Sequence, residues 1–264
     1  MSHGKNFGGC VLVCAVVALF GAPRLVTAQD GGIESRAAES RAAESRATES
    51  RPVEPPFARR IGGDMVVAAE RLERGGEIEW RAGKSRISTA LPVGYPDPTP
   101  PGAVDLKRYP AVRRAEVTRT DGADAGRNMA FWPLFQHIEK NGIAMTSPVE
   151  MDYAPKKAGQ NPLADESWTM SFLYRKPDMG KTGTDGKVVV ADKAGLLYIS
   201  LGMRGGYTRK AVDLGVETLR AWLKEQTEWE EDGPPRSLYY NGPEARNGDK
   251  WAEVQLPVRP RAKP

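Results

Sequence analysis

FWPLFQHIEKNGIAMTSPVEM, residues 131–151, carries the strongest signal for the fold, because it joins a helix to the strands after it. Its first half has large apolar side chains at i, i+3, i+4 and i+7, which are Phe131, Leu134, Phe135 and Ile138. This stripe predicts an amphipathic helix over Ala130–Lys140. Pro133 fits there if it lies in the first turn. Asn141 and Gly142 end the helix, because both accept a left-handed backbone.

Strands are predicted on both sides of this helix. Runs of β-branched and aromatic residues between Gly, Pro and Asp predict strands over Lys107–Thr118, Ile143–Met145, Val149–Tyr153, Trp168–Tyr174, Lys187–Ala191, Leu196–Met203, Leu238–Asn241 and Trp251–Val258. A second amphipathic helix is predicted over Thr208–Gln226. Few of the connections are helical crossovers, so the pattern predicts an α+β fold in which an antiparallel sheet carries two helices.

The region before Lys107 is less regular. Asp64–Arg74 is compatible with a short helix and Glu77–Arg81 with a strand. Leu91–Gly102 has five prolines in twelve residues. Proline removes a backbone donor and prevents regular structure, so we expect an extended loop over the surface here.

The N-terminus has the pattern of an export signal. Lys5 precedes the apolar run VLVCAVVALF (Val11–Phe20), and small residues end the segment at Ala28. The run is shorter than the ~20 residues that span a membrane. We therefore expect residues 1–28 to be a cleaved signal peptide, and no stable membrane span to remain. The alternative is an uncleaved signal that anchors the chain in the membrane. The expected location is the periplasm or the exterior of the cell.

A charged, proline-containing spacer is predicted over residues 29–60. It repeats the unit ESRAA from Glu34 to Arg51 and offers no apolar face that could dock on a domain. Residues 61–264 are predicted to form one domain.

Composition excludes several classes of function. The net charge is +4, and removal of residues 1–28 takes away Lys5 and Arg24 and leaves +2. That balance does not favour nucleic acid as a partner. Cleavage of the signal peptide would remove Cys10 and Cys14, so disulfides, thiolate catalysis and cysteine metal sites are excluded from the mature chain. No hydrolase, nucleotide or metal motif is present, so no enzyme is predicted. The acidic residues Glu228, Glu230, Glu231 and Asp232 are expected to form a solvated turn.

The stretch at 131–151 resembles the signature of the SOUL haem-binding family, which is a helix of the form F-x-x-L-F-x-Y-I, an Asn/Gly turn and I-A-M-T-x-P-V. Four further segments match in the family's order, from the strand at Lys107 to the one at Trp251. They are KRYPAVRRAEV (107–117), WTMSFLY (168–174), Gly205-Gly206-Tyr207, and RNGDKWAEVQL (246–256). Together they cover residues 105–258 best.

The resemblance implies a distorted antiparallel β-barrel or sheet with two flanking helices. It also implies a haem or related tetrapyrrole ligand, held by an apolar groove on the first helix and by basic loop residues at its propionates. The candidate binding residues are Met129, Trp132, Pro133, Gln136, His137, Arg246 and Lys250. Alternatives are a different hydrophobic ligand in the same fold, or an enzyme that uses carboxylates not identified in the sequence.

His137 replaces the Tyr of many relatives and is the one candidate for a metal ligand. On a helical wheel it lies about 110° from the centre of the apolar stripe, which argues against a core position. It is then either a solvated surface histidine or an axial ligand of the haem iron. Met145, within the signature, is expected to be core.

Overall fold

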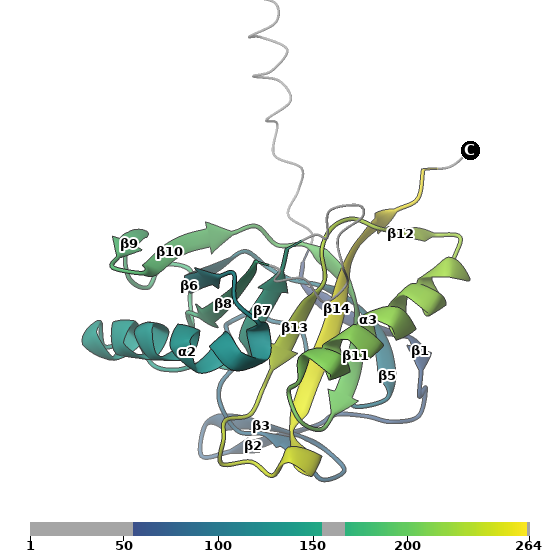
Figure 1. The fold of residues 1–264 in the computed structure, drawn as a ribbon. Coiled ribbons are helices and arrows are strands. Elements are labelled where there is room, and N and C mark those ends of the chain that lie inside the picture. The colour runs from purple at the N-terminus through teal and green to yellow at the C-terminus, as the bar shows by residue number, and fades with distance from the viewer. Residues whose placement is uncertain (1–54, 155–166, 263–264) are drawn as a thin grey trace, which may run out of the picture. The chain divides into compact units, whose positions relative to one another are not determined.

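The computed structural model describes residues 55–154 and 167–262 (Figure 1). The predicted signal peptide at residues 1–28 and the spacer up to residue 54 lie outside the described residues. The first described strand, β1 (Phe57–Gly63), begins four residues before the expected domain start at residue 61.

An antiparallel sheet of 11 strands forms the body of the domain. Its main path runs β1, β5 (Ala103–Arg108), β11 (Leu197–Arg204), β14 (Trp251–Pro260), β13 (Arg236–Tyr239), β7 (Val149–Tyr153), β8 (Trp168–Leu173), β6 (Val112–Arg119), β10 (Val188–Lys193) and β9 (Gly183–Asp185). β12 (Trp229–Glu231) pairs with β14 off this path. The path does not close on itself, so the fold is an open, distorted sheet and not a closed barrel.

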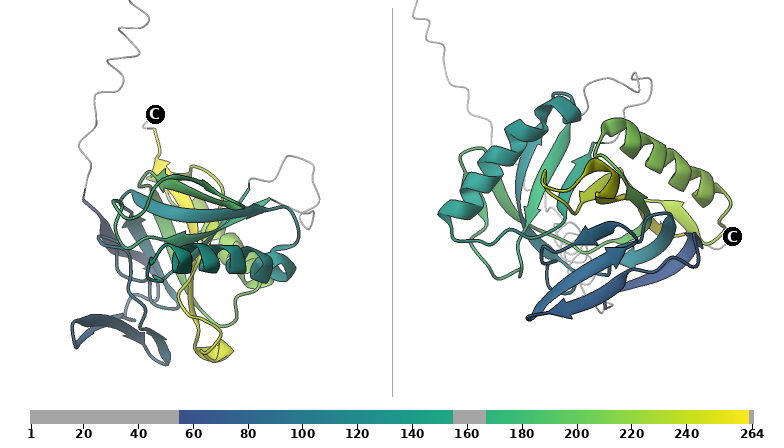
Figure 2. Two further views of the ribbon diagram at one scale, coloured as in Figure 1. Left: turned by 90° about the vertical axis from the view of Figure 1, so that its left-hand side faces the viewer. Right: turned by 90° about the horizontal axis from the view of Figure 1, so that it is seen from below.

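Two halves of the chain repeat one arrangement. β5, β6, α2 (Ala123–Lys140), β7 and β8 form the first half, and β10, β11, α3 (Arg209–Lys224), β13 and β14 form the second. The halves meet where β7 pairs with β13. In addition, the first strand of each half pairs with the second strand of the other half: β5 pairs with β11, and β10 pairs with β6. The helices diverge from neighbouring N-termini, as the right-hand view of Figure 2 shows. Each helix thus covers one half of the sheet.

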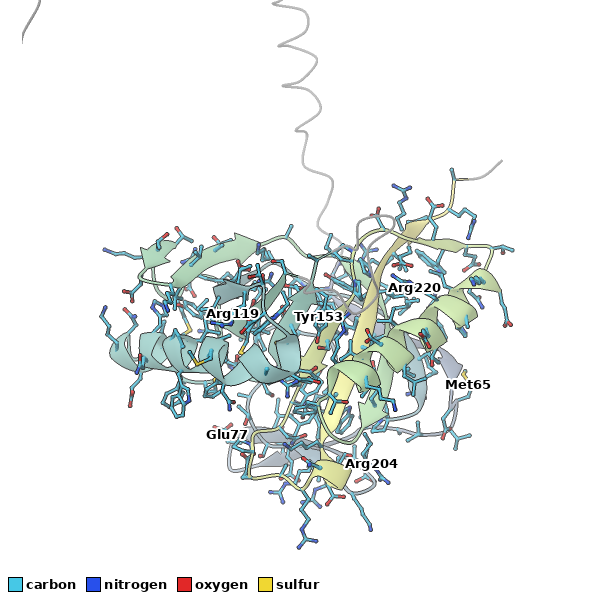
Figure 3. The ribbon with its side chains drawn as sticks, in the orientation of Figure 1. Met65, Glu77, Arg119, Tyr153, Arg204 and Arg220 are labelled. Atoms are coloured by element: carbon cyan, nitrogen blue, oxygen red, sulfur yellow. The ribbon has the colours of Figure 1, made fainter. Side chains whose placement is uncertain are left out.

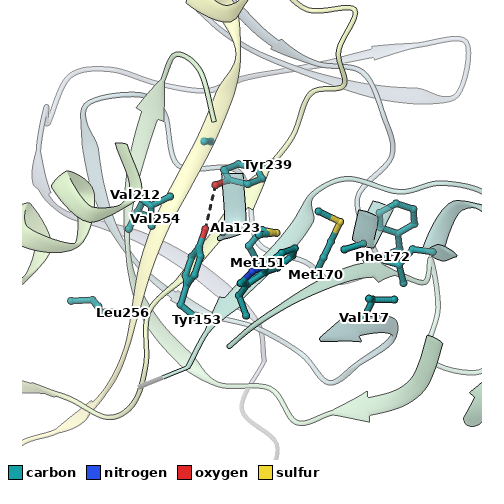
Figure 4. Close-up of a cluster of buried hydrophobic side chains, with 14 of the residues drawn as sticks. Val117, Ala123, Met151, Tyr153, Met170, Phe172, Val212, Tyr239, Val254 and Leu256 are labelled. Atoms are coloured by element: carbon teal, nitrogen blue, oxygen red, sulfur yellow. Dashed lines mark hydrogen bonds between the residues drawn. The ribbon is translucent and has the colours of Figure 1, made fainter. Parts of the chain in front are cut away.

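The main core lies between the helices and the sheet. Leu134 and Ile138 of α2 and Val212 and Leu219 of α3 belong to one apolar cluster with the inward-facing strand residues. Figure 4 shows Met151, Met170 and Phe172 in its middle. Tyr153 and Tyr239 bring hydroxyl groups into this cluster, 3.4 Å apart.

The opposite face of the sheet is buried and charged. The ammonium of Lys107 lies 2.8 Å from the carboxylate of Glu253, and both side chains are fully buried. Thr99 of the proline-rich loop covers this pair, since its N–H donates to Glu253 at 2.7 Å. The loop at Leu91–Gly102 was expected on the surface, which is wrong in part: Pro92, Pro96, Pro98, Thr99 and Pro100 are buried. Proline lacks the N–H that burial would leave unpaired, so the loop tolerates this position.

Several element predictions need correction. Asp64–Arg74 is no helix, because Glu70–Arg74 is strand β2, which forms a separate small sheet with β3 (Glu77–Ala82) and β4 (Ser85–Ile87). Lys107–Thr118 is not one strand but spans β5 and β6. Ile143–Met145 is not a strand. The first helix begins seven residues earlier than predicted, which places Pro133 in its interior.

Candidate functional site

Four of the predicted binding residues form one row along the outer face of α2. Met129 and Trp132 are 60% and 58% exposed, Gln136 is exposed and Pro133 is half-buried. Among the described residues, Trp132 is the one aromatic side chain in the set of exposed large hydrophobic groups. Its ring packs edge-on against the half-buried rings of Phe131 and Phe135, with centroids 5.8 and 6.0 Å away. The row therefore exposes apolar side chains, and the Trp132 ring packs against the two phenylalanine rings.

The predicted loop residues flank a short 3-10 helix, η1 (Asn247–Asp249). The ammonium of Lys250 lies 5.2 Å from the centroid of the Tyr207 ring, and Arg246 is exposed. Tyr207 stacks on Tyr239 with centroids 4.2 Å apart.

On the other side of this stack, the guanidinium of Arg127 on α2 lies 5.4 Å from the centroid of the Tyr239 ring. An aromatic stack therefore connects Lys250 to the first helix. Sequence reasoning missed Arg127 and Tyr239. Tyr207 was recognised only as part of the Gly205-Gly206-Tyr207 motif. A tyrosine after two glycines, together with a basic loop, could have indicated a residue of the binding site.

His137 is buried, contrary to the expectation of a residue outside the core. It is 8% exposed, and both ring nitrogens have partners inside the protein (Nδ1–Oδ2 of Asp185, 2.8 Å; Nε2–Oη of Tyr174, 2.9 Å). The pKa of Asp185 is held below its ordinary value mainly by the hydrogen bond from His137. The Asp185 carboxylate is therefore ionised and accepts this hydrogen bond. Burial raises the pKa of Tyr174, which therefore keeps its proton and donates to Nε2. No nitrogen lone pair of His137 is left for iron unless one of these bonds breaks.

Small residues explain why the wheel misplaced His137. The buried side of α2 includes Ala123, Gly126 and Ala130, which a stripe of large apolar side chains does not reveal. Phe131 and Phe135, which dominated the predicted stripe, are only half-buried at its edge. The buried arc is thus rotated toward His137. Met145 is half-buried and packs against the main core, as expected.

The N-termini of the two helices are in contact. The carboxylate of Asp124 on α2 accepts from the backbone N–H of Arg209, the first residue of α3, at 3.0 Å. A cavity of about 420 Å³ lies between α3 and the segments at the end of β7 and before β13, and Tyr153, Arg209 and Arg220 are among its lining residues. Figure 3 labels Tyr153 and Arg220. The guanidinium of Arg209 lies 4.6 Å from the centroid of the Tyr153 ring.

Glu150 and two residues of the acidic cluster take part in ion pairs. Glu150 is fully buried; burial alone would raise its pKa, but Arg236 and Arg114 outweigh that effect and hold the pKa low. The acidic cluster is not a simple turn, because Glu230 and Glu231 lie in β12 and pair with Arg259 and Arg220. Within residues 55–154 and 167–262, no group of three or more His, Cys, Asp or Glu side chains is arranged to hold a metal ion. None of the helices described there is long and apolar enough to cross a membrane.

Comparison with known proteins gives a family and a fold. The family model described as SOUL heme-binding protein matches residues 98–257. No curated protein sequence matches the chain. The EcmrR–DNA complex structure is similar with 16% identity and a TM-score of 0.50, over 59% of this chain and 56% of that one. The EcmrR C-terminal domain (15%, TM-score 0.49, 59% and 96%) and a hydrolase from Listeria innocua (15%, TM-score 0.44, 62% and 94%) are also similar. At these identities the first likeness supports the fold alone.

Proposed function

Because the chain belongs to the SOUL heme-binding protein family, we propose that it binds haem or a related tetrapyrrole on the outer face of α2. The family is one of binding proteins, so no catalytic step is invoked. An export signal at residues 1–28 would place this binding outside the cytoplasm, where the protein sequesters or carries its ligand.

The exposed row of Met129 and Trp132 is the observation that carries this proposal. Apolar side chains that lie next to one another on an exposed face, as Met129, Trp132 and Pro133 do, are candidates for a binding surface. A porphyrin is a flat apolar plate, and a tryptophan ring offers it a stacking partner. Burying roughly 400 Å² of the plate at about 25 cal/mol per Å² contributes on the order of 10 kcal/mol. Association costs about 4–15 kcal/mol, so the plate alone leaves a thin margin.

Basic residues supply the remainder. Lys250 and Arg246 are the predicted contacts for the propionates, and Arg127 joins them because the Tyr207–Tyr239 stack connects it to Lys250. Charge-assisted hydrogen bonds of this kind contribute about 1.5–3 kcal/mol each. Iron ligation by His137 is not part of the proposal, because Tyr174 and Asp185 already occupy its two nitrogens.

A hemin titration followed by the Soret band tests the proposal. The double variant Met129→Ala/Trp132→Ala should weaken binding at least about tenfold, since it removes the apolar platform. Leu214→Ala is the matched control, because Leu214 is 62% exposed on the other helix. Arg246→Ala/Lys250→Ala should also weaken binding at least about tenfold.

Two results would contradict the proposal. If the platform variant and the Leu214 variant bind hemin equally well, the outer face of α2 is not the site. If wild type gives no Soret shift with hemin, the ligand is a different hydrophobic molecule or the protein does something else.

A further inference from the structure

A large cavity lies away from the Met129–Trp132 row, at the C-terminal end of α2. It measures about 720 Å³, within the range of small-molecule sites. Its walls are the last turn of α2 with the residues after it, Tyr174 at the end of β8, and the segment Met179–Asp185 that leads into β9. Of the seven residues predicted to bind haem, His137 alone lines it.

The walls of this cavity are held in place from both sides. His137 connects α2 to Asp185 on one side and to Tyr174 on the other. Arg113 of β6 donates to the carbonyl of Gly180 at 2.9 Å and pairs with Asp192, which ties the segment to the sheet. Gly180 has a positive φ of 65°, and a Cβ there would lie 3.0 Å from the Tyr174 ring. A larger residue at this position would push the segment Met179–Asp185 away from Tyr174. Glycine therefore allows this wall of the cavity to pack closely.

Three exposed polar side chains of the lining, Lys181, Thr182 and Thr184, are able to donate hydrogen bonds to a ligand. The Asp185 carboxylate is engaged by His137 at 2.8 Å and by Lys140 at 3.4 Å. Lys181, in contrast, makes no ion pair with any residue that the structure describes, and the Thr182 and Thr184 side chains make no hydrogen bond there. An ammonium and two hydroxyl groups together favour a ligand rich in acceptors.

Apolar side chains form another part of the lining. Ile143 and Val190 are buried at the cavity wall, and Met179 packs beside them. The carbonyl end of α2 carries partial negative charge, which opposes an anion placed against it. An anionic ligand therefore directs its charge toward Lys181 and its apolar part toward Ile143 and Val190.

We infer that this cavity is a second ligand site, for a small organic anion with an apolar body, such as an aromatic carboxylate. The site is separate from the haem platform proposed above and does not depend on it. Its specificity comes from Lys181 and the two threonines, while the Asp185–His137–Tyr174 chain keeps its walls in place.

Titration of the full-length chain with benzoate, followed by the backbone amide NMR shifts of residues 179–185, tests the inference. We expect saturable shifts with a Kd on the order of 1 mM, typical of so small a ligand. Lys181→Ala should weaken binding at least about fivefold, because it removes the countercharge. Lys187→Ala is the matched control, an exposed lysine of the same hairpin that does not line the cavity.

Further titrations separate the ligand classes and the two sites. Benzyl alcohol, which has the ring without the charge, should bind at least about fivefold more weakly than benzoate. Thr182→Val/Thr184→Val should weaken benzoate as well, and saturating hemin should leave the benzoate shifts in place. No saturable shift with benzoate, or equal binding by the Lys181 variant, would overturn the inference. Inorganic phosphate that matches benzoate would show that the apolar wall plays no part, and loss of the benzoate shifts on addition of hemin would show one site instead of two.

Discussion

The helices α2 and α3 occupy equivalent places in the two halves of the sheet, yet they are built differently. α3 is an ordinary amphipathic helix, because Thr208 caps its N-terminus and Val212, Val216, Leu219 and Leu223 form its buried side. α2 starts at Gly122 without a side-chain cap. It buries Leu134 and Ile138 together with small residues and a histidine, and it exposes Met129 and Trp132.

This difference separates stability from function. The large apolar groups of α3 other than Leu214 and Trp222 are buried in the core, where burial stabilises the fold. On α2 part of the buried side consists of small residues, while the two large apolar groups Met129 and Trp132 face water. The exposed Trp132 is part of the binding surface proposed for α2, whereas no ligand is proposed for α3.

The largest expected effect compares one apolar residue from each helix. Leu219→Ala should lower the free energy of unfolding by about 2–5 kcal/mol, because it leaves a cavity in a fully buried site. Trp132→Ala should lower it by less than about 1 kcal/mol, the scale of its edge-on aromatic contacts. Urea unfolding of both variants measures this. Equal losses would mean that Trp132 is a structural residue, and the functional contrast between the helices would be lost.

The second prediction concerns the buried histidine, which has no counterpart among the buried residues of α3. His137→Ala should lower the free energy of unfolding by about 1–3 kcal/mol, because the buried hydroxyl of Tyr174 loses its partner. Tyr174→Phe is the control, since it removes the same hydrogen bond without leaving a buried hydroxyl. Hemin binding should survive in His137→Ala; its loss would identify His137 as the iron ligand after all.

His137→Ala should also change how the free energy of unfolding depends on pH in the acid range. The folded pKa of Asp185 lies below the ordinary value of 3.8, mainly because His137 donates to it. The ionised carboxylate therefore stabilises the fold at neutral pH, and that contribution disappears as the pH falls through the lowered pKa. His137→Ala should flatten this loss below about pH 4, as measured by urea midpoints across the acid range. An unchanged acid limb would show that the Asp185–His137 contact does not persist in solution.

A smaller effect is expected at the helix N-termini. The Thr208 hydroxyl accepts from the N–H of Ala211 at 3.2 Å, so Thr208→Ala should cost about 1 kcal/mol. Thermal unfolding detects this change. Thr227→Ala serves as the control, because Thr227 is exposed and lies after the end of α3. A loss as small as that of the control would mean that α3 needs no cap.

The smallest expected effect is a gain on α2. Gly122 has no side chain to cap the helix, and nothing lies within 4 Å of the place where a Cβ would stand. Gly122→Ser should stabilise the protein by a few tenths of a kcal/mol through a new hydrogen bond to the first turn. If it destabilises instead, the start of α2 is held by its contact with α3, in which Asp124 accepts from Arg209.

Much of the fold was predictable from local pattern. The second helix and most strands were found within a few residues, because β-branched runs and a stripe of large apolar groups are signals that neighbours in sequence carry. Met129, Trp132, Arg246 and Lys250 were found through a family resemblance, and their role in binding stays a prediction. The short helix at Asp64–Arg74 failed because its segment pairs with β3, and strand pairing overrides weak local propensity.

The amino-acid sequence alone was enough to establish an α+β domain with an antiparallel sheet, two helices and a family signature. The rotation of α2, the open edge of the sheet and the partners of His137 became visible only in the folded molecule. Those partners lie 37 and 48 residues further along the chain, beyond the reach of any helical pattern. Periodicity reports where the large apolar residues of a helix lie, but the side that packs against the sheet also includes small residues such as Ala130, and this packing buries the histidine.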